Sequence, residues 1–309
     1  MKHNLYKGGV VPMKHNLFGD PVLQGFREHL VVQGKSQNTI TSYITSVTKY
    51  MVWFSTRYGK APSQLFAENV AEYKEDLNRQ TVSAATFNVR MAGLHTWNEY
   101  LVSEGIQSTI VIHKNDKKKI QQQYASPAIH TEQEVQRFIQ SVLESQNKRD
   151  YTLVNLLAYT GLRISEALHL ELHDVHLESR ELVVRSGKGN KTRTVFLSDK
   201  LVRLIRDYMK QERGQYGLAH VSPYLFLSNR SPQLSRITAF KFFAKYSEAT
   251  GICPPISPHD LRHFFCSNAL EKVLNVHEVA AIAGHSNIHT TLMYTNPSRK
   301  KILEKINSL

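Results

Sequence analysis

The chain has 309 residues, of which 41% are hydrophobic and 21% are charged. This composition is typical of a globular protein with a sizeable core, and it excludes a disordered basic tail. Two domains are expected, because a compact domain usually has about 100–200 residues. No apolar run approaches the roughly 20 residues of a membrane-spanning helix, and the first residues lack the apolar core of a secretion signal. Two cysteines, Cys253 and Cys266, argue against a disulfide scaffold and favour the cytoplasm.

The formal net charge is +13, from 39 Lys and Arg against 26 Asp and Glu. Residues 1–122 carry 15 basic and 9 acidic side chains, and residues 123–309 carry 24 and 17, so both halves are positive. This excess favours a polyanionic partner, with nucleic acid ahead of an anionic membrane surface. A generally basic, soluble surface would have the same composition, so charge alone does not identify the partner.

The N-terminal segment contains a short repeat, in which Met1–Leu5 recurs as Met13–Leu17. The repeat is far shorter than the roughly 20–50 residues of a repeat-protein unit. One interpretation is that Met13 is the true start, since codons for Lys7-Gly8-Gly9 can spell a ribosome-binding sequence. Residues 1–17 are predicted to form a disordered extension.

Helical periodicity dominates residues 18–112. One apolar face has spacings of three and four, and consists of Ile40, Tyr43, Ile44, Val47, Met51 and Phe54. Ser36 or Asn38 is placed to cap this helix, and Gly59 lies beyond its end. Further helices are predicted over residues 66–79 and 83–105, so a small helical bundle is expected.

Residues 113–128 are polar and contain four lysines and three consecutive glutamines, a composition typical of an interdomain linker. Two interpretations remain open for this segment. It is either a solvated loop or a strap whose lysines contact a phosphate backbone.

The second domain, residues 129–309, opens with a capping box formed by Thr131 and Glu134. Its further predicted elements are a helix over residues 151–159, strands over 182–184 and 194–196 with a turn-rich loop between them, and helices after residue 198. The expected fold is therefore mainly α, with one small antiparallel β-sheet in the second domain.

Four segments of this domain concentrate basic, imidazole and hydroxyl side chains: Thr160–Glu166, Ser186–Lys191, His259–His263 and Gly284–Tyr294. They contain no P-loop and no Gly-x-Ser-x-Gly nucleophile turn. The pairs His259/His263 and His285/His289 have a spacing that suits zinc on one helix face. Zinc is nevertheless disfavoured, because the first pair lacks the Glu of a zinc-protease helix and both pairs lie among Arg and Ser.

These residue types suit phosphoryl transfer without a metal. A phosphodiester under attack spreads negative charge over its non-bridging oxygens, which match the paired N–H donors of a guanidinium. An imidazole, with an ordinary pKa of about 6.5, suits the proton of the nucleophile. A lysine ammonium on the hairpin loop suits the leaving oxygen.

From residue 18 to its end, the chain resembles the tyrosine recombinases of the phage-integrase and Xer type. The resemblance rests on four motifs that occur in order: Thr-Gly-Leu-Arg-Ile-Ser-Glu, Gly-Lys-Gly-Asn-Lys-Thr-Arg, His-Asp-Leu-Arg-His-Phe-Phe and Gly-His-Ser-Asn-Ile-His-Thr-Thr-x-x-Tyr. One such match arises easily by chance, but four in order do not. The resemblance implies an N-terminal SAM-like core-binding domain and a mostly helical catalytic domain, which close as a clamp around DNA.

The resemblance also implies roles for the matched side chains. Tyr294 is the nucleophile, which forms a 3′-phosphotyrosyl bond and frees a 5′-hydroxyl. Arg163 and Arg262 hold the non-bridging oxygens of the phosphate. His259 is the general base toward Tyr294 and the acid on the return. No metal and no ATP are required, because the covalent bond keeps the energy of the broken one.

Lys188 is implied as the general acid for the 5′ oxygen, with Lys191 as its competitor. His285 donates a further hydrogen bond to the phosphate, and Glu166 orients the site from behind Arg163. His263 is interpreted as a residue that packs beside the site, not as an acid or base. His289 is interpreted as a surface residue.

The implied partner is double-stranded DNA, on which the protein forms a tetramer and exchanges strands through a four-way junction. Residues Arg299–Ile306 are expected to dock on a neighbouring protomer or to fold back on their own domain. Two alternative functions remain, a type IB topoisomerase and a non-catalytic DNA-binding module. A mobile element is the favoured context for integration, excision or resolution, and the sequence does not identify accessory proteins or base-reading residues.

Overall fold

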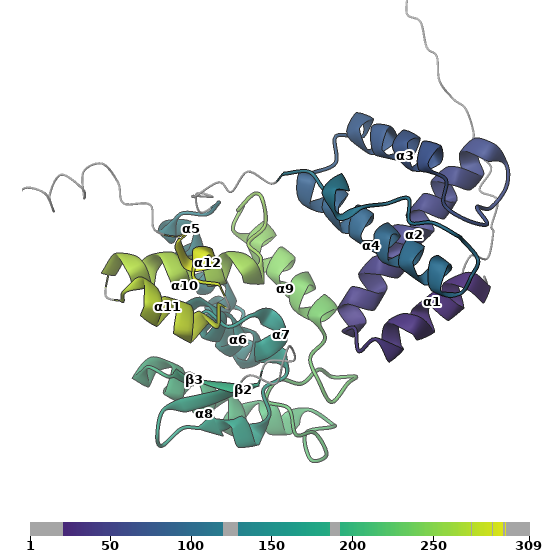
Figure 1. The fold of residues 1–309 in the computed structure, drawn as a ribbon. Coiled ribbons are helices and arrows are strands. Elements are labelled where there is room, and N and C mark those ends of the chain that lie inside the picture. Colours follow the sequence, from purple (N-terminus) through teal and green to yellow (C-terminus); the bar gives the residue numbers. More distant parts are fainter. Residues whose placement is uncertain are drawn as a thin grey trace, which may run out of the picture. The chain divides into compact units, whose positions relative to one another are not determined.

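The computed structural model describes residues 21–119, 129–185, 192–272, 274–285, 287–292 and 294. The chain divides into two compact units, Met1–Gln122 and Gln123–Leu309, and each is considered by itself. Helices predominate in both units, and the strands of the described residues belong to the second (Figure 1).

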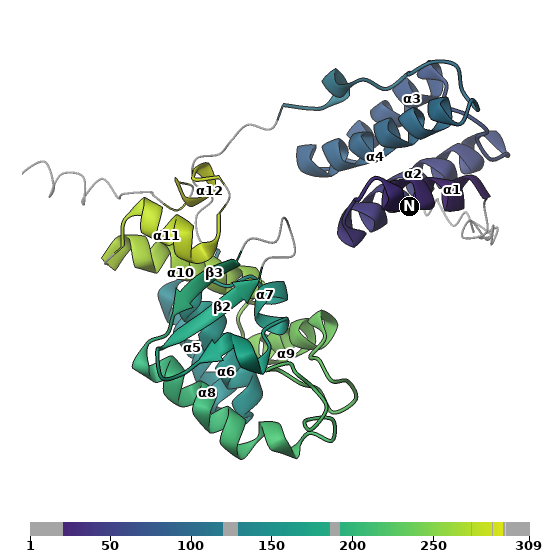
Figure 2. The same cartoon turned by 60° about the horizontal axis from the view of Figure 1, so that its bottom comes forward.

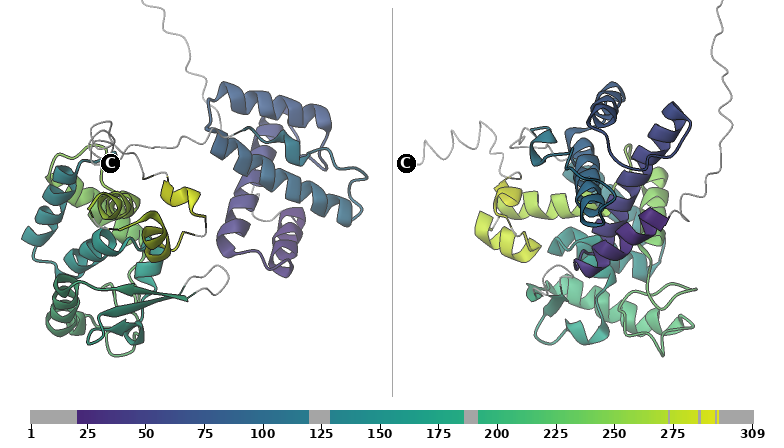
Figure 3. Two further views of the ribbon diagram at one scale, coloured as in Figure 1. Left: turned by 60° about the vertical axis from the view of Figure 1, so that its left-hand side comes forward. Right: turned by 45° about the vertical axis from the view of Figure 1, so that its right-hand side comes forward.

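The N-terminal unit is a bundle of four α-helices in its described residues. Its two longest helices, α2 and α4, pack against each other, α1 contacts both of them, and α3 packs on α2. Figure 3 shows these helices from two further sides. The bounds are α1 Pro21–Val32, α2 Gln37–Tyr58, α3 Ala67–Arg79 and α4 Ala84–Ser103, followed by the short 3-10 helix η2 at Lys114–Asp116.

Helix α2 begins and ends where the sequence predicts. The Ser36 side chain accepts a hydrogen bond from the backbone amide of Thr39 at 3.3 Å, and Gly59 ends the helix with a φ of 70°. The predicted apolar face is buried, with Tyr43 partly buried at its edge; its buried members are Ile40, Ile44, Val47, Met51 and Phe54. The bundle predicted for this region is therefore confirmed.

Side-chain amides on α4 fasten the segment that follows it. The buried Asn98 carboxamide accepts hydrogen bonds from the backbone amides of Val111 at 2.8 Å and Ile112 at 3.2 Å. The Asn88 carboxamide pairs with both backbone groups of Lys118, at 2.9 and 2.8 Å. These bonds satisfy backbone groups that have no partner in a regular element.

Part of the predicted linker therefore contacts the helices of the N-terminal unit, through Lys118 and through an ion pair of Asp116 with Lys74. The rest of the linker, residues 120–128, lies outside the described residues, as does the predicted extension at residues 1–17.

The C-terminal unit starts with α5, where Thr131 and Glu134 form the predicted capping box at 3.2 and 2.8 Å. The helical elements are α5 Glu132–Glu144, α6 Lys148–Thr160, α7 Ile164–Leu168, η3 Leu172–Asp174, α8 Asp199–Gln211, η4 Arg213–Gln215, α9 Arg236–Ala249, α10 Pro258–Lys272, α11 Val276–Ala283 and α12 His289–Leu292. Figure 2 labels α5 to α12 together with β2 and β3 in a second view.

The sheet of this unit has three antiparallel strands in the order β1-β2-β3. The predicted pair is present as β2 (Glu181–Arg185) and β3 (Thr192–Phe196). A further strand, β1 (Val175–His176), pairs with the start of β2. The sequence did not indicate β1, because two residues are too few to show an alternation of apolar and polar positions.

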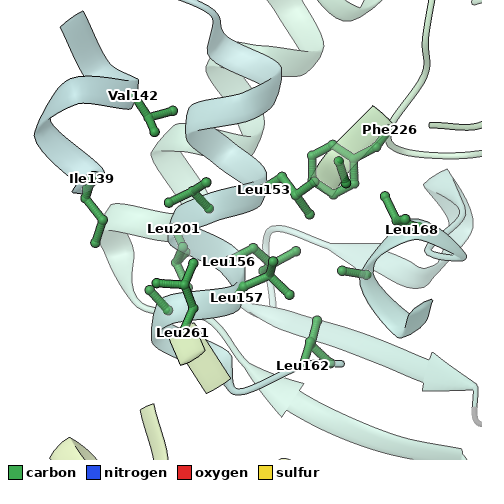
Figure 4. Packing of buried hydrophobic residues seen from close by; sticks show 14 of the residues in the cluster. Ile139, Val142, Leu153, Leu156, Leu157, Leu162, Leu168, Leu201, Phe226 and Leu261 are labelled. Atoms are coloured by element: carbon green, nitrogen blue, oxygen red, sulfur yellow. The ribbon is translucent and has the colours of Figure 1, made fainter. Parts of the chain in front are cut away.

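Helix α6 lies at the centre of the unit and contacts α5, α7, α8 and α10. Its side chains Leu153, Leu156 and Leu157 are fully buried, and residues from neighbouring elements surround them, among them Val142 and Phe226 (Figure 4). A helix that is covered on all sides carries apolar residues all round. Because its neighbours hold α6 in place, the C-terminal end of the helix is fixed as well, and the Thr160–Glu166 segment begins there.

The observed fold is mainly α with a small antiparallel sheet, as predicted from the sequence. Within the described ranges, no helix is both long enough and apolar enough to cross a membrane.

Candidate active site

Three segments that are distant in the sequence meet in the C-terminal unit: the turn after α6 with the start of α7, the N-terminal half of α10, and the described residues from the end of α11 to Tyr294. They belong to three of the four motifs. Together they carry the predicted residues Arg163, Glu166, His259, Arg262, His285 and Tyr294.

The turn after α6 requires a glycine for two reasons. Gly161 has a φ of 65°, a backbone conformation that residues with a Cβ rarely adopt. A Cβ at this position would also lie 2.3 Å from Cδ1 of Phe265 on α10. The turn therefore brings the α6–α7 connection against α10, and it places Arg163 two residues later at the N-cap of α7.

Glu166 holds Arg163 from behind. The backbone amide of Arg163 donates to Glu166 Oε2 at 2.8 Å, and its guanidinium Nη1 donates to Oε1 at 2.9 Å. The other end of the fork, Nη2, donates to the carbonyl of Gly284 at 3.0 Å. The Arg163 side chain remains 44% exposed, whereas that of Glu166 is 7% exposed, so the guanidinium is accessible and its partner is not.

Arg262, on α10, is a buried cation. Its Nη1 donates to the carbonyl of Gly161, while its Nη2 is buried and finds no partner among the described residues. An unsatisfied buried donor costs about 1–3 kcal/mol, and more when it is charged. Burial and the nearby Arg163 charge both lower the pKa of Arg262 from its ordinary value. The local field therefore favours an anion at this point.

Imidazole rings surround the tyrosine. The rings of His259 and His263 pack edge to face with centroids 4.7 Å apart, and His263 makes the same kind of contact with Tyr294, also at 4.7 Å. The ring of His285 lies parallel to that of Tyr294 at 6.1 Å, and its Nδ1 is 2.7 Å from the hydroxyl of Thr291. His263 thus packs beside the site, as interpreted from the sequence.

The environment keeps these side chains neutral. Burial, followed by the Arg262 charge, lowers the pKa of His259, and the same causes together with Arg163 lower that of His285 to about 4. Burial and nearby Cys266 raise the pKa of Tyr294 to about 12. At neutral pH a protonated phenol therefore lies among imidazoles that can accept a proton, beside two guanidinium groups.

The remaining candidates are Lys188, Lys191, His289 and the C-terminal segment Arg299–Ile306. Lys188 and its competitor Lys191 are outside the described residues, as is the C-terminal segment Arg299–Ile306. His289 is exposed at the start of α12, as interpreted.

Sequence reasoning missed two residues of this region. Thr291 contacts His285, and Arg193, on β3, makes a bidentate hydrogen bond with Glu166 at 2.9 and 2.8 Å. Both residues lie inside the four motifs, so their place in the sequence indicated a connection with the site. Their contacts could not be inferred from the sequence, because their partners lie on other elements.

Within the described residues, no group of three or more His, Cys, Asp or Glu side chains has a geometry that could hold a metal ion.

Comparison with known proteins relates this fold and site to a family. The model of the phage integrase family matches residues 129–301, and that of the phage integrase N-terminal SAM-like domain matches residues 22–108. The TnP I resolvase of Bacillus thuringiensis is 43% identical over 289 residues, which cover 93% of this chain and 99% of that protein. The tyrosine recombinase XerA of Pyrococcus horikoshii is 30% identical over 296 residues, or 95% of each chain.

Among solved structures, the XerH site-specific recombinase bound to a palindromic difH substrate superimposes with a TM-score of 0.72 at 20% identity. The match covers 93% of this chain and 94% of that one. At this identity the similarity concerns the fold.

These matches define the class of the protein as a tyrosine recombinase, an enzyme of site-specific DNA recombination. The chain belongs to the phage integrase family, with both its catalytic region and its SAM-like region represented. The family and the type of enzyme predicted from the motifs are confirmed.

Proposed function

We propose that this protein breaks and rejoins DNA through a 3′-phosphotyrosyl bond to Tyr294, and that it serves a mobile element. The strongest support for the chemistry is the buried Arg262 Nη2, which has no partner among the described residues and lies in the same site as Arg163 and Tyr294. A phosphodiester supplies the acceptor oxygens that such a donor needs.

Binding of the scissile phosphate comes first. One non-bridging oxygen accepts from Arg262, and the exposed Arg163 guanidinium faces the same phosphate. Both cations stabilise the phosphate more strongly as negative charge accumulates on its oxygens in the transition state. His285 adds a hydrogen bond from the ring nitrogen that is not occupied by Thr291.

In the cleavage step, the Tyr294 hydroxyl oxygen attacks the phosphorus and the bond to the 5′ oxygen breaks. His259 accepts the phenol proton, and Lys188 gives a proton to the departing 5′ oxygen. Because the pKa of Tyr294 is raised to about 12, the phenol is protonated before attack and a base is needed. Rejoining reverses each step, with the 5′-hydroxyl of the exchanged strand as the nucleophile.

The family resemblance further implies a tetramer on two DNA sites, with exchange through a four-way junction, as the assembly that carries out this reaction. The mobile-element context is supported by the 43% identity to the TnP I resolvase. Resolution of joined molecules is therefore the form of recombination we favour.

The decisive experiment traps the covalent intermediate. The protein itself selects its target from randomised duplexes, and a nicked version of the selected site is then incubated with it. We expect a covalent adduct on the 3′ phosphate with the wild-type protein. The Tyr294→Phe variant should bind the same duplex with unchanged affinity and give no adduct, because it lacks the attacking oxygen.

A Tyr224→Phe variant serves as the matched control, because Tyr224 belongs to the same unit but not to the site. Adduct formation by Tyr294→Phe would assign the nucleophile to another residue. Relaxation of supercoiled plasmid by the wild-type protein without any joining of two sites would instead establish a topoisomerase.

A further inference from the structure

Arg193 makes more contacts in the active-site region than any assigned role explains. It lies on β3, five positions after Lys188 in the sequence, and its side chain is only 16% exposed. Its Nη1 and Nη2 donate to the two oxygens of Glu166 at 2.9 and 2.8 Å. Its Nε donates to the carbonyl of Ile282 at 2.9 Å, near the end of α11.

The Glu166 carboxylate is shared between two arginines. Oε1 accepts from the guanidinium groups of Arg163 and Arg193, and Oε2 accepts from the Arg163 amide and from Arg193. Although burial raises the pKa of Glu166, the hydrogen bonds of Arg193 and Arg163 outweigh it and hold the pKa below its ordinary value. The carboxylate is thus a single negative charge between two positive ones.

This sharing affects the charge that Arg163 offers to a phosphate. With Arg193 present, Glu166 neutralises only part of the charge of Arg163. Without Arg193, the buried carboxylate would have Arg163 as its remaining cationic partner, and the two would form a neutral pair. Arg193 therefore keeps Arg163 both oriented and electropositive.

Arg193 also fixes the turn that precedes His285. Gly284 ends α11 with a φ of 68°, and its carbonyl accepts from Arg163. A Cβ at Gly284 would lie 2.7 Å from the guanidinium carbon of Arg193, so this guanidinium packs directly against the glycine. One planar group thus connects β3, α7 and the end of α11, which a lysine cannot reproduce because it lacks the rigid fork.

We infer that Arg193 is a positioning residue for strand cleavage. It acts through Glu166 on Arg163, and through the Ile282–Gly284 backbone on the turn that carries His285. Each of its guanidinium nitrogens donates to a protein acceptor, so the inference assigns it no contact with DNA. This inference rests on the proposed role of Arg163 at the scissile phosphate.

The test compares single-turnover cleavage by Arg193→Gln and Arg193→Lys with saturating nicked duplex. We expect Arg193→Gln to cleave about 100-fold more slowly, the scale of loss that follows a displacement of about 1 Å at a catalytic group. DNA affinity should change less than about threefold, because the guanidinium nitrogens of Arg193 bond to protein acceptors. Arg193→Lys should recover part of the rate, since it restores the charge without the fork. Arg206→Lys on α8, in an ion pair with an exposed Glu178, is the control and should match the wild type.

A second substrate separates positioning of Arg163 from a general loss of structure. Replacing one non-bridging oxygen of the scissile phosphate by a methyl group removes the negative charge that Arg163 neutralises. On this substrate the deficit of Arg193→Gln should shrink to less than about tenfold, as should that of an Arg163→Ala reference variant. An equal deficit on both substrates would mean a structural role only and would overturn the inference.

A third substrate tests the alternative that Arg193 acts through Lys188. A sulfur at the 5′ bridging position leaves without a general acid, so it restores cleavage where only proton donation is impaired. If the Arg193→Gln variant cleaved this substrate at the wild-type rate, the inference would be overturned. Absence of an adduct with the wild-type protein would count against the proposed function instead, whereas equal rates for wild type and Arg193→Gln would count against Arg193 alone.

Discussion

At the scale of single residues, the site contains guanidinium groups for which the surrounding protein supplies too few hydrogen-bond acceptors. Arg262 is 3% exposed and has a guanidinium nitrogen without a partner among the described residues. Glu166, the buried carboxylate of these motifs, already accepts hydrogen bonds from Arg163 and Arg193. A site built only for stability would pair each buried charge. The surplus of donors is instead what a phosphate ligand requires.

The neutral state of His259 leads to a prediction about pH. Burial and the Arg262 charge lower its pKa below the ordinary value of 6.5, so the ring remains able to accept a proton at lower pH than a free histidine does. We expect the cleavage rate at subsaturating DNA, which reports groups of the free protein, to be flat above pH 6.5 and to fall only below it. The measurement is the initial rate of adduct formation between pH 4.5 and 8.5.

The control for this profile is His259→Gln, which should lower the plateau and remove the dependence on His259 protonation. An acid limb centred above pH 6.5 would contradict the assignment of His259 as the base. Tyr294 should not contribute, because its pKa of about 12 lies beyond the range measured.

At the scale of elements, the active site depends on how helices end. The end of α6 determines where Arg163 lies, and the end of α11 determines where His285 lies; both helices end at a glycine of positive φ. Neither glycine has room for a Cβ, because Phe265 fills the space at Gly161 and Arg193 fills it at Gly284. The turns are thus fixed by packing as well as by backbone conformation.

Substitution of Gly161 tests this dependence. Gly161→Ala should lower the free energy of unfolding by more than about 1 kcal/mol, from the positive φ alone, and the clash with Phe265 should add to this loss. Cleavage should also slow at temperatures where the variant is folded, because the turn carries Arg163. Urea denaturation and single-turnover cleavage measure the two effects.

Gly214, within η4, is the matched control because a Cβ there would meet nothing within 4 Å and its φ is not in the left-handed region. We expect Gly214→Ala to be within about 0.5 kcal/mol of the wild type. A Gly161→Ala protein as stable as this control would mean that α10 can move away from the turn.

At the scale of the whole molecule, the basic excess is distributed over both units. The N-terminal half of the sequence has 15 basic and 9 acidic side chains, and the C-terminal part has 24 and 17. The SAM-like and catalytic regions both match family models, so both parts are represented in the relatives of this chain. A duplex contacted by both units would release many counterions.

The salt dependence of DNA binding tests this distribution. We expect the affinity of the full chain for its selected duplex to fall at least tenfold between 50 and 200 mM salt, because each phosphate contact contributes about −0.9 to the slope of log affinity against log salt. Fluorescence anisotropy at several salt concentrations gives the slope. A slope near zero would contradict binding through phosphate contacts on both units.

The sequence by itself determined the elements whose signals are local. Caps at Ser36 and Thr131, the buried face of α2, and the β2–β3 hairpin depend on neighbours a few residues away, so periodicity and cap residues reveal them. The ordered motifs likewise indicated the family, because each motif is contiguous. Strand β1 was not predicted from the sequence, because its two residues form a strand only by pairing with Leu182 and Glu181.

Only the tertiary structure decided which side chains act on one another. Arg193 contacts Glu166 across 27 positions and Ile282 across 89, and Asn98 holds a segment 13 or 14 positions away, just before the predicted linker. Contacts of this kind depend on the direction in which each element leaves the core. In the C-terminal unit that direction is set by the burial of α6 and by glycine turns packed against Phe265 and Arg193, and not by any pattern local to the residues concerned.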